Sequence, residues 1–139
     1  MRSKSWLGGI VVAVIYFLLG WVFYGLLMKD WFASQSTMSS MEPNVAIIAL
    51  MCLMYGLLMA YTYPIGYRGG AAMSEGWRFG VLFALIVNGP SGLAMVAMGG
   101  WSWIGLIVGW IYEIVVGAVL GIVLAKIYGD SVKAASPAM

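Results

Sequence analysis

Residues 101–128 read WSWIGLIVGWIYEIVVGAVLGIVLAKIY, and this stretch decides the fold class. Glu113 is the only charged residue between Trp101 and Ala125. An α-helix rises about 1.5 Å per residue, so a stretch of this length can cross about 30 Å of hydrocarbon. Backbone groups in lipid must be hydrogen-bonded within the chain, which leaves a helix as the form of a single span. The stretch therefore predicts a transmembrane helix over residues 102–127.

Three further apolar stretches of similar length precede it, at residues 6–28, 44–63 and 77–98. Hydrophobic residues make up 63% of the chain and charged residues only 9%, whereas soluble domains carry about 25% charged residues. A chain this apolar has too few polar side chains to cover a soluble surface, so the expected solvent is the lipid bilayer. The sequence therefore predicts an all-α, four-helix transmembrane bundle that forms a single domain over residues 1–139.

The lysine and arginine residues predict the orientation of this bundle. Of the seven in the chain, Lys29 alone falls between the first and second spans, on the predicted outer side. The others fall on the opposite side: Arg2, Lys4, Arg68, Arg78, Lys126 and Lys133. Cytoplasmic segments of membrane proteins carry the excess of these residues. Both termini are therefore predicted to lie in the cytoplasm (N-in/C-in).

Several classes of function are disfavoured by composition. The chain has no histidine, which excludes His-based haem and zinc sites and serine–histidine catalysis. Its net charge of +2 is too small to suggest nucleic-acid binding. Soft sulfur ligands suit Cu(I), so Met38, Met41, Met51 and Met54 with Cys52 could suggest a copper site. Methionine is also common in apolar cores, and we interpret these residues as core packing. The sequence shows no nucleophile–base pair and no phosphate-binding glycine loop. We therefore expect that the protein is not an enzyme and that it binds no metal and no cofactor.

Glu113 is the most informative residue because it falls near the middle of its span, roughly 15–18 Å from either end. A charged carboxyl at that depth is costly, so Glu113 should face protein or water rather than lipid. Small residues recur every four positions around it: Gly105, Gly109, Gly117, Gly121 and Ala125. The third span has a similar row: Gly80, Ala84, Asn88 and Gly92. Such rows let two helices approach closely.

Asn88 is the polar member of the second row. A tight turn at Gly99 and Gly100 makes the third and fourth spans antiparallel neighbours, and counting from it places Asn88 and Glu113 at about equal depth. We predict that these two side chains hydrogen-bond. Pro90 lacks a backbone donor and clashes with the preceding turn, which predicts a kink or a short break in the third span.

A polar layer at mid-depth is the predicted binding site, with Tyr16 and Tyr55 completing it from the first and second spans. Its members are Glu113, Asn88, Ser91, Pro90, Tyr16 and Tyr55. The competing interpretation is structural, because Asn and Glu often only clamp helices together, at about 1 kcal/mol for each hydrogen bond.

A family resemblance rests on short motifs: GWVFY (residues 20–24) followed by Lys29 and Trp31, LMAY (residues 58–61), and Tyr112-Glu113 followed by Gly117-Ala118. These resemble a widespread bacterial family of small four-helix membrane proteins known as a domain of unknown function. The resemblance implies the four-span fold in a bacterial inner (cytoplasmic) membrane and supplies no activity. That family usually has a histidine after the tyrosine, so Glu113 is a departure that puts any shared proton or metal role in doubt.

Two hypotheses of function follow. In the first, the protein is a small membrane module that binds or passes a proton, a cation or a small molecule at the midplane polar layer. In the second, it is a non-catalytic accessory or assembly subunit of a larger membrane complex. The small-residue rows exceed what one internal contact needs, so a homo-oligomer is also expected.

Overall fold

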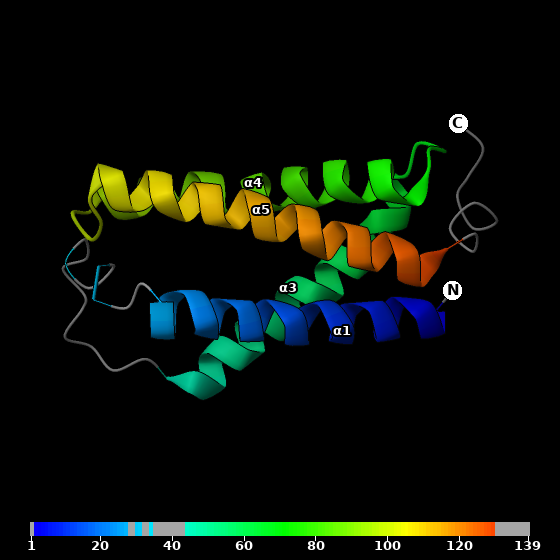
Figure 1. Ribbon diagram of the computed structural model, residues 1–139, viewed down its shortest axis with the longest axis horizontal. Coiled ribbons are helices and arrows are strands. Elements are labelled where there is room, and N and C mark those ends of the chain that lie inside the picture. The colour runs from blue at the N-terminus through cyan, green and yellow to red at the C-terminus, as the bar shows by residue number, and fades with distance from the viewer. Residues whose placement is uncertain (1, 28–29, 32–33, 35–43, 130–139) are drawn as a thin grey trace.

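The computed structural model describes residues 2–27, 30–31, 34 and 44–129, and this part of the chain is all-α (Figure 1). Its long helices are α1 (Arg2–Gly20), which continues into the π-helix η1 (Trp21–Leu27), α3 (Val45–Gly66), α4 (Ala72–Ala97) and α5 (Trp103–Tyr128). Four helices are long and apolar enough to cross a membrane. The all-α fold with four such helices is therefore confirmed. The predictions made for Met28, Lys29, Met38, Met41 and Lys133 concern residues outside the described ranges.

The helix boundaries differ from the predicted ones at α4, which begins at Ala72 rather than at Trp77. The connection before α4 is held by Glu75, whose carboxylate accepts hydrogen bonds from the backbone N–H groups of Arg68 and Gly70, each at 3.2 Å. Glu75 is 92% buried and lies in the first turn of α4. A carboxylate at this position also interacts favourably with the helix dipole, so the helix starts more than one turn earlier than the apolar pattern indicates.

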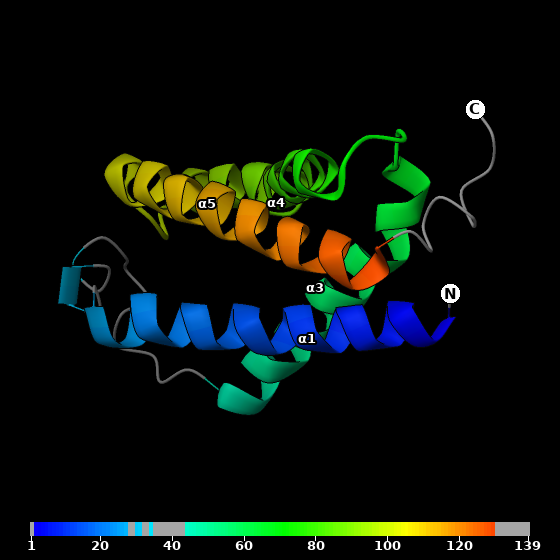
Figure 2. The same cartoon turned by 45° about the vertical axis from the view of Figure 1, so that its right-hand side comes forward.

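The antiparallel helices α4 and α5 form one close pair, as predicted (Figures 1 and 2). Their contact is made by glycines, with Gly76 and Gly80 of α4 lying against Gly117 and Gly121 of α5. A Cβ atom on Gly80 would collide with the backbone carbonyl oxygen of Gly117. The two backbones can approach this closely only because these positions carry no side chains.

Helices α1 and α3 form a second close pair. Their backbones also approach closely at glycine residues. A Cβ atom on Gly56 of α3 would collide with the carbonyl oxygen of Gly9 and lie within 3.0 Å of the backbone nitrogen of Ala13, both on α1. Gly9 and Ala13 are both buried. This pair was not predicted from the sequence.

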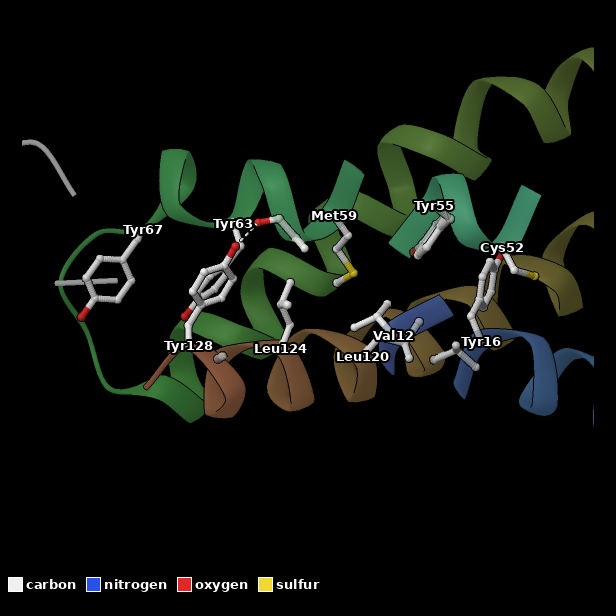
Figure 3. Packing of buried hydrophobic residues seen from close by; sticks show 13 residues of the cluster. Val12, Tyr16, Cys52, Tyr55, Met59, Tyr63, Tyr67, Leu120, Leu124 and Tyr128 are labelled. Carbon is white, nitrogen blue, oxygen red and sulfur yellow. Dashed lines mark hydrogen bonds between the residues drawn. The ribbon is translucent and has the colours of Figure 1, made fainter. Parts of the chain in front are cut away.

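The two helix pairs meet where α1 packs against α5 and where aromatic side chains fill the core (Figure 3). Tyr63 of α3 stacks on Tyr128 of α5 with ring centroids 5.4 Å apart, and both are fully buried. The Tyr128 hydroxyl also bonds the Ser5 hydroxyl of α1 at 3.1 Å. The start of α1 and the end of α5 therefore lie at the same end of the molecule (Figure 1).

Tyr128 also replaces a backbone hydrogen bond that Pro64 removes from α3. Pro64 lies inside this helix, and because proline has no N–H it cannot bond the carbonyl of the residue four positions earlier, Ala60. The Tyr128 hydroxyl donates to that carbonyl oxygen at 2.5 Å (Figure 3). Helix α3 can therefore continue past Pro64 to Gly66, rather than ending at residue 63 as predicted.

Replacing Tyr128 by phenylalanine should lower the free energy of unfolding by about 1–3 kcal/mol, because it leaves a buried carbonyl without a donor. Unfolding by sodium dodecyl sulfate, followed by tryptophan fluorescence, measures the change. Tyr61→Phe is the matched control, since the Tyr61 side chain is 67% exposed on the same helix that carries Pro64. Equal stability of the two variants would contradict the repair of α3 by Tyr128.

Candidate functional site

The Glu113 carboxylate lies at the meeting point of three helices. Tyr16 of α1 donates its hydroxyl to Glu113, at 3.0 Å from Oε2 and 3.2 Å from Oε1. Asn88 of α4 donates its amide Nδ2 to Oε2 at 3.2 Å. The predicted hydrogen bond between Asn88 and Glu113 is therefore confirmed, and the Tyr16 side chain joins it from the opposite helix pair.

Asn88 is itself fixed in position by two further hydrogen bonds. Its amide also donates to the Ala84 carbonyl one turn earlier in α4, at 3.1 Å. Its backbone carbonyl accepts the indole N–H of Trp110 from α5 at 3.2 Å. Sequence reasoning missed Trp110, although residues three apart lie on one face of a helix, and Trp110 stands three positions before Glu113. This spacing was the available signal.

Tyr55 belongs to the layer through its ring rather than through a hydrogen bond to Glu113. Its ring faces that of Tyr16 (Figure 3), with the two ring centroids 4.3 Å apart. The centroid of the Phe83 ring lies 4.9 Å from that of Tyr55. The side chain is only 6% exposed, and within the described part of the chain its hydroxyl has no hydrogen-bond partner. Tyr55 therefore contributes ring packing to the layer rather than a bond to the carboxylate.

Pro90 and Ser91 lie at the edge of this arrangement, and both are exposed. Of the two alternatives predicted at Pro90, a kink or a short break, the short break is wrong, because α4 runs as one helix from Ala72 to Ala97. The Ser91 hydroxyl donates to the Val87 carbonyl at 2.9 Å, and the Trp110 indole bonds the Asn88 carbonyl. These bonds hold the turns around Pro90 in helical register while the proline ring lies on the exposed face.

A half-enclosed groove of about 190 Å³ lies between α4 and α5 beside Glu113. Its polar lining comes from Glu113, Asn88 and Ser91, and its apolar walls from Trp101, Trp110, Met95 and Leu106. Three of the six predicted binding residues therefore line one groove. Tyr16 reaches the same carboxylate from α1, while Tyr55 and Pro90 do not line the groove. Trp101 and Trp110 were not among the predicted binding residues.

The Glu113 carboxylate can take up a proton or pair with a positively charged group. Within residues 2–27, 30–31, 34 and 44–129, no three or more His, Cys, Asp or Glu residues are grouped so as to hold a metal ion. Both donors to Glu113, a phenol and an amide, are neutral. A carboxylate held by neutral donors keeps its negative charge available, and it can take up a proton or pair with a cation.

Comparison of the chain with protein-family models, with curated proteins and with solved structures finds no match. The resemblance to a family of small bacterial four-helix proteins therefore stays a hypothesis.

Proposed function

We propose that this chain is a multi-pass protein of the bacterial inner membrane, with both termini in the cytoplasm, that binds or passes a proton, a cation or a small polar molecule at Glu113. The proposed orientation is supported by the distribution of positive charge. Six of the seven lysine and arginine residues fall on one predicted side of the membrane, and the cytoplasmic side usually carries the excess.

Support for a membrane location comes from the outer surface of the helices. Large apolar side chains are more than half exposed on all four, including Leu18 of α1, Leu50 of α3, Ile86 of α4 and Ile111 of α5. Soluble monomers rarely expose contiguous apolar patches of more than a few hundred Å². Hydrocarbon covers such a surface without cost, whereas water does not.

The single observation that carries the proposed activity is the setting of the Glu113 carboxylate. It lies in the interior of α5 rather than near either helix end, and it borders an open groove. Neutral Tyr16 and Asn88 hold it in one orientation. Ionisable residues inside membrane spans are costly, and most serve ion or substrate pathways.

The second candidate, an accessory or assembly subunit, is favoured by one feature of the same site. Glu113 connects α5 to α1 and α4 at once, which is what a structural clamp does. In that case the carboxyl group would hold the bundle together and would exchange nothing with solvent.

Infrared difference spectroscopy of the protein in bilayers, with Glu113→Gln as the control, separates the two candidates. The chain has five acidic residues, and the difference against this variant isolates the carboxyl band of Glu113. We expect a band that titrates between about pH 5 and 8 because the carboxyl group exchanges protons with water. A band that stays unchanged over that range would overturn the exchange proposal and favour the structural clamp.

A further inference from the structure

We infer that the groove between α4 and α5 binds a small amphipathic organic cation, with its ammonium group at Glu113 and its apolar body between the indoles of Trp101 and Trp110. This inference rests on the proposed function and names the class of ligand for the same site.

The charge of the groove favours a cationic ligand. Glu113 is the only charged residue among those that line it, and no ion pair with Glu113 is found within the described ranges. Asn88 and Ser91 add polar groups without adding charge. A carboxylate in surroundings of low polarity attracts a cation more strongly than it does in water, so a positive group gains most at this end of the groove.

The walls of the groove favour a ligand with an apolar, preferably aromatic, body. Trp101 and Trp110 line the groove and can stack on an aromatic ring, and Met95 and Leu106 complete the apolar lining. The indole of Trp110 is fixed because its N–H is bonded to the Asn88 carbonyl. Gly92 makes room for this ring, since a Cβ atom there would lie 3.0 Å from its Nε1 atom.

The size of the groove limits the ligand. Its volume of about 190 Å³ is below the range of about 300–1,000 Å³ that is usual for sites of drug-sized molecules. The half-enclosed shape leaves one side open. These dimensions favour a single ring that carries a short ammonium group over a lipid or a multi-ring compound.

Benzyltrimethylammonium is a suitable probe because its charge is permanent and does not change with pH. We expect the purified full chain in detergent to bind it in isothermal titration calorimetry, and to bind the neutral isostere neopentylbenzene at least about tenfold more weakly. Glu113→Gln should reduce affinity for the cation by about tenfold or more because the charge is lost while an acceptor oxygen remains.

Substitutions of tryptophan test the walls separately from the charge. Trp101→Leu should weaken binding of the cation by about 2- to 10-fold, the range that corresponds to one aromatic pair, and Trp101→Phe should restore part of the loss. Trp103→Leu is the matched control, because Trp103 is two residues away, 63% exposed and outside the groove. Size-exclusion chromatography of each variant verifies that the fold is intact.

The outcomes distinguish this inference from the proposed function. Equal affinity for the cation and its neutral isostere, or equal effects of Trp101→Leu and Trp103→Leu, would overturn the inference. A Glu113 carboxyl that titrates in the infrared experiment while benzyltrimethylammonium fails to bind would leave the proposed function standing and reject the organic cation. If neither is observed, both proposals fail.

Discussion

Replacing Gly80 by alanine is expected to lower the free energy of unfolding by about 2–3 kcal/mol, at the upper end of the usual cost of overpacking. The added Cβ atom would overlap the backbone carbonyl oxygen of Gly117. A flexible side chain could rotate away from such a contact, but a helix backbone can only move as a unit. Helices α4 and α5 would therefore have to separate along the seam that also carries Asn88 and Glu113.

Gly20→Ala is the matched control for this experiment. Gly20 also lies in a helix, at the end of α1, but the nearest atom to a new Cβ there would be the Tyr112 hydroxyl at 3.9 Å, an ordinary contact. Unfolding by sodium dodecyl sulfate, followed by tryptophan fluorescence, compares the two variants. If Gly80→Ala proved as stable as Gly20→Ala, the close approach of α4 and α5 would be wrong.

The sequence predicted the α4–α5 half of the fold because its signals are local and repeated. Glycines recur at the spacing of one helical turn on both helices, and the turn at Gly99 and Gly100 fixes which residues lie at equal depth. Gly99 has a φ of +76°, a conformation that glycine adopts without strain. Counting from this turn was enough to place Asn88 beside Glu113, and their hydrogen bond confirms the count.

The α1–α3 half could not be predicted in the same way. The connection between its helices is long, so depth cannot be counted across it, and the contact depends chiefly on Gly9, Ala13 and Gly56 rather than on a repeated row. The support of α3 at Pro64 depends on Tyr128, a residue of another helix. Only the tertiary structure brings these residues together.

The rows of small residues also bear on the expectation of a homo-oligomer. Gly76 and Gly80 of α4 and Gly117 and Gly121 of α5 are all buried against each other within one chain. The internal contact between α4 and α5 therefore already uses these four glycines. A second copy of the chain, if it binds, would have to use other surfaces.

Replacing Glu113 by leucine is expected to lower the free energy of unfolding by about 1–3 kcal/mol, because the hydroxyl of Tyr16 loses its acceptor. Tyr16 is 8% exposed, so water cannot readily replace the carboxylate. The Asn88 amide suffers less, since it keeps its hydrogen bond to Ala84. Glu113→Gln should cost less than Glu113→Leu, because its side-chain oxygen can still accept one hydrogen bond.

A second substitution tests whether this loss comes from Tyr16. Replacing both partners of a buried hydrogen bond by apolar groups can be nearly neutral, whereas replacing one leaves a polar group unsatisfied. The double variant Glu113→Leu/Tyr16→Phe should therefore be more stable than Glu113→Leu alone, by about 1 kcal/mol. A double variant that is less stable than Glu113→Leu would show that the Tyr16 hydroxyl is stabilised by other groups. The double variant would regain stability but would still lack the carboxylate, so it should not bind a cation. It would therefore separate the contribution of Glu113 to stability from its proposed role in binding.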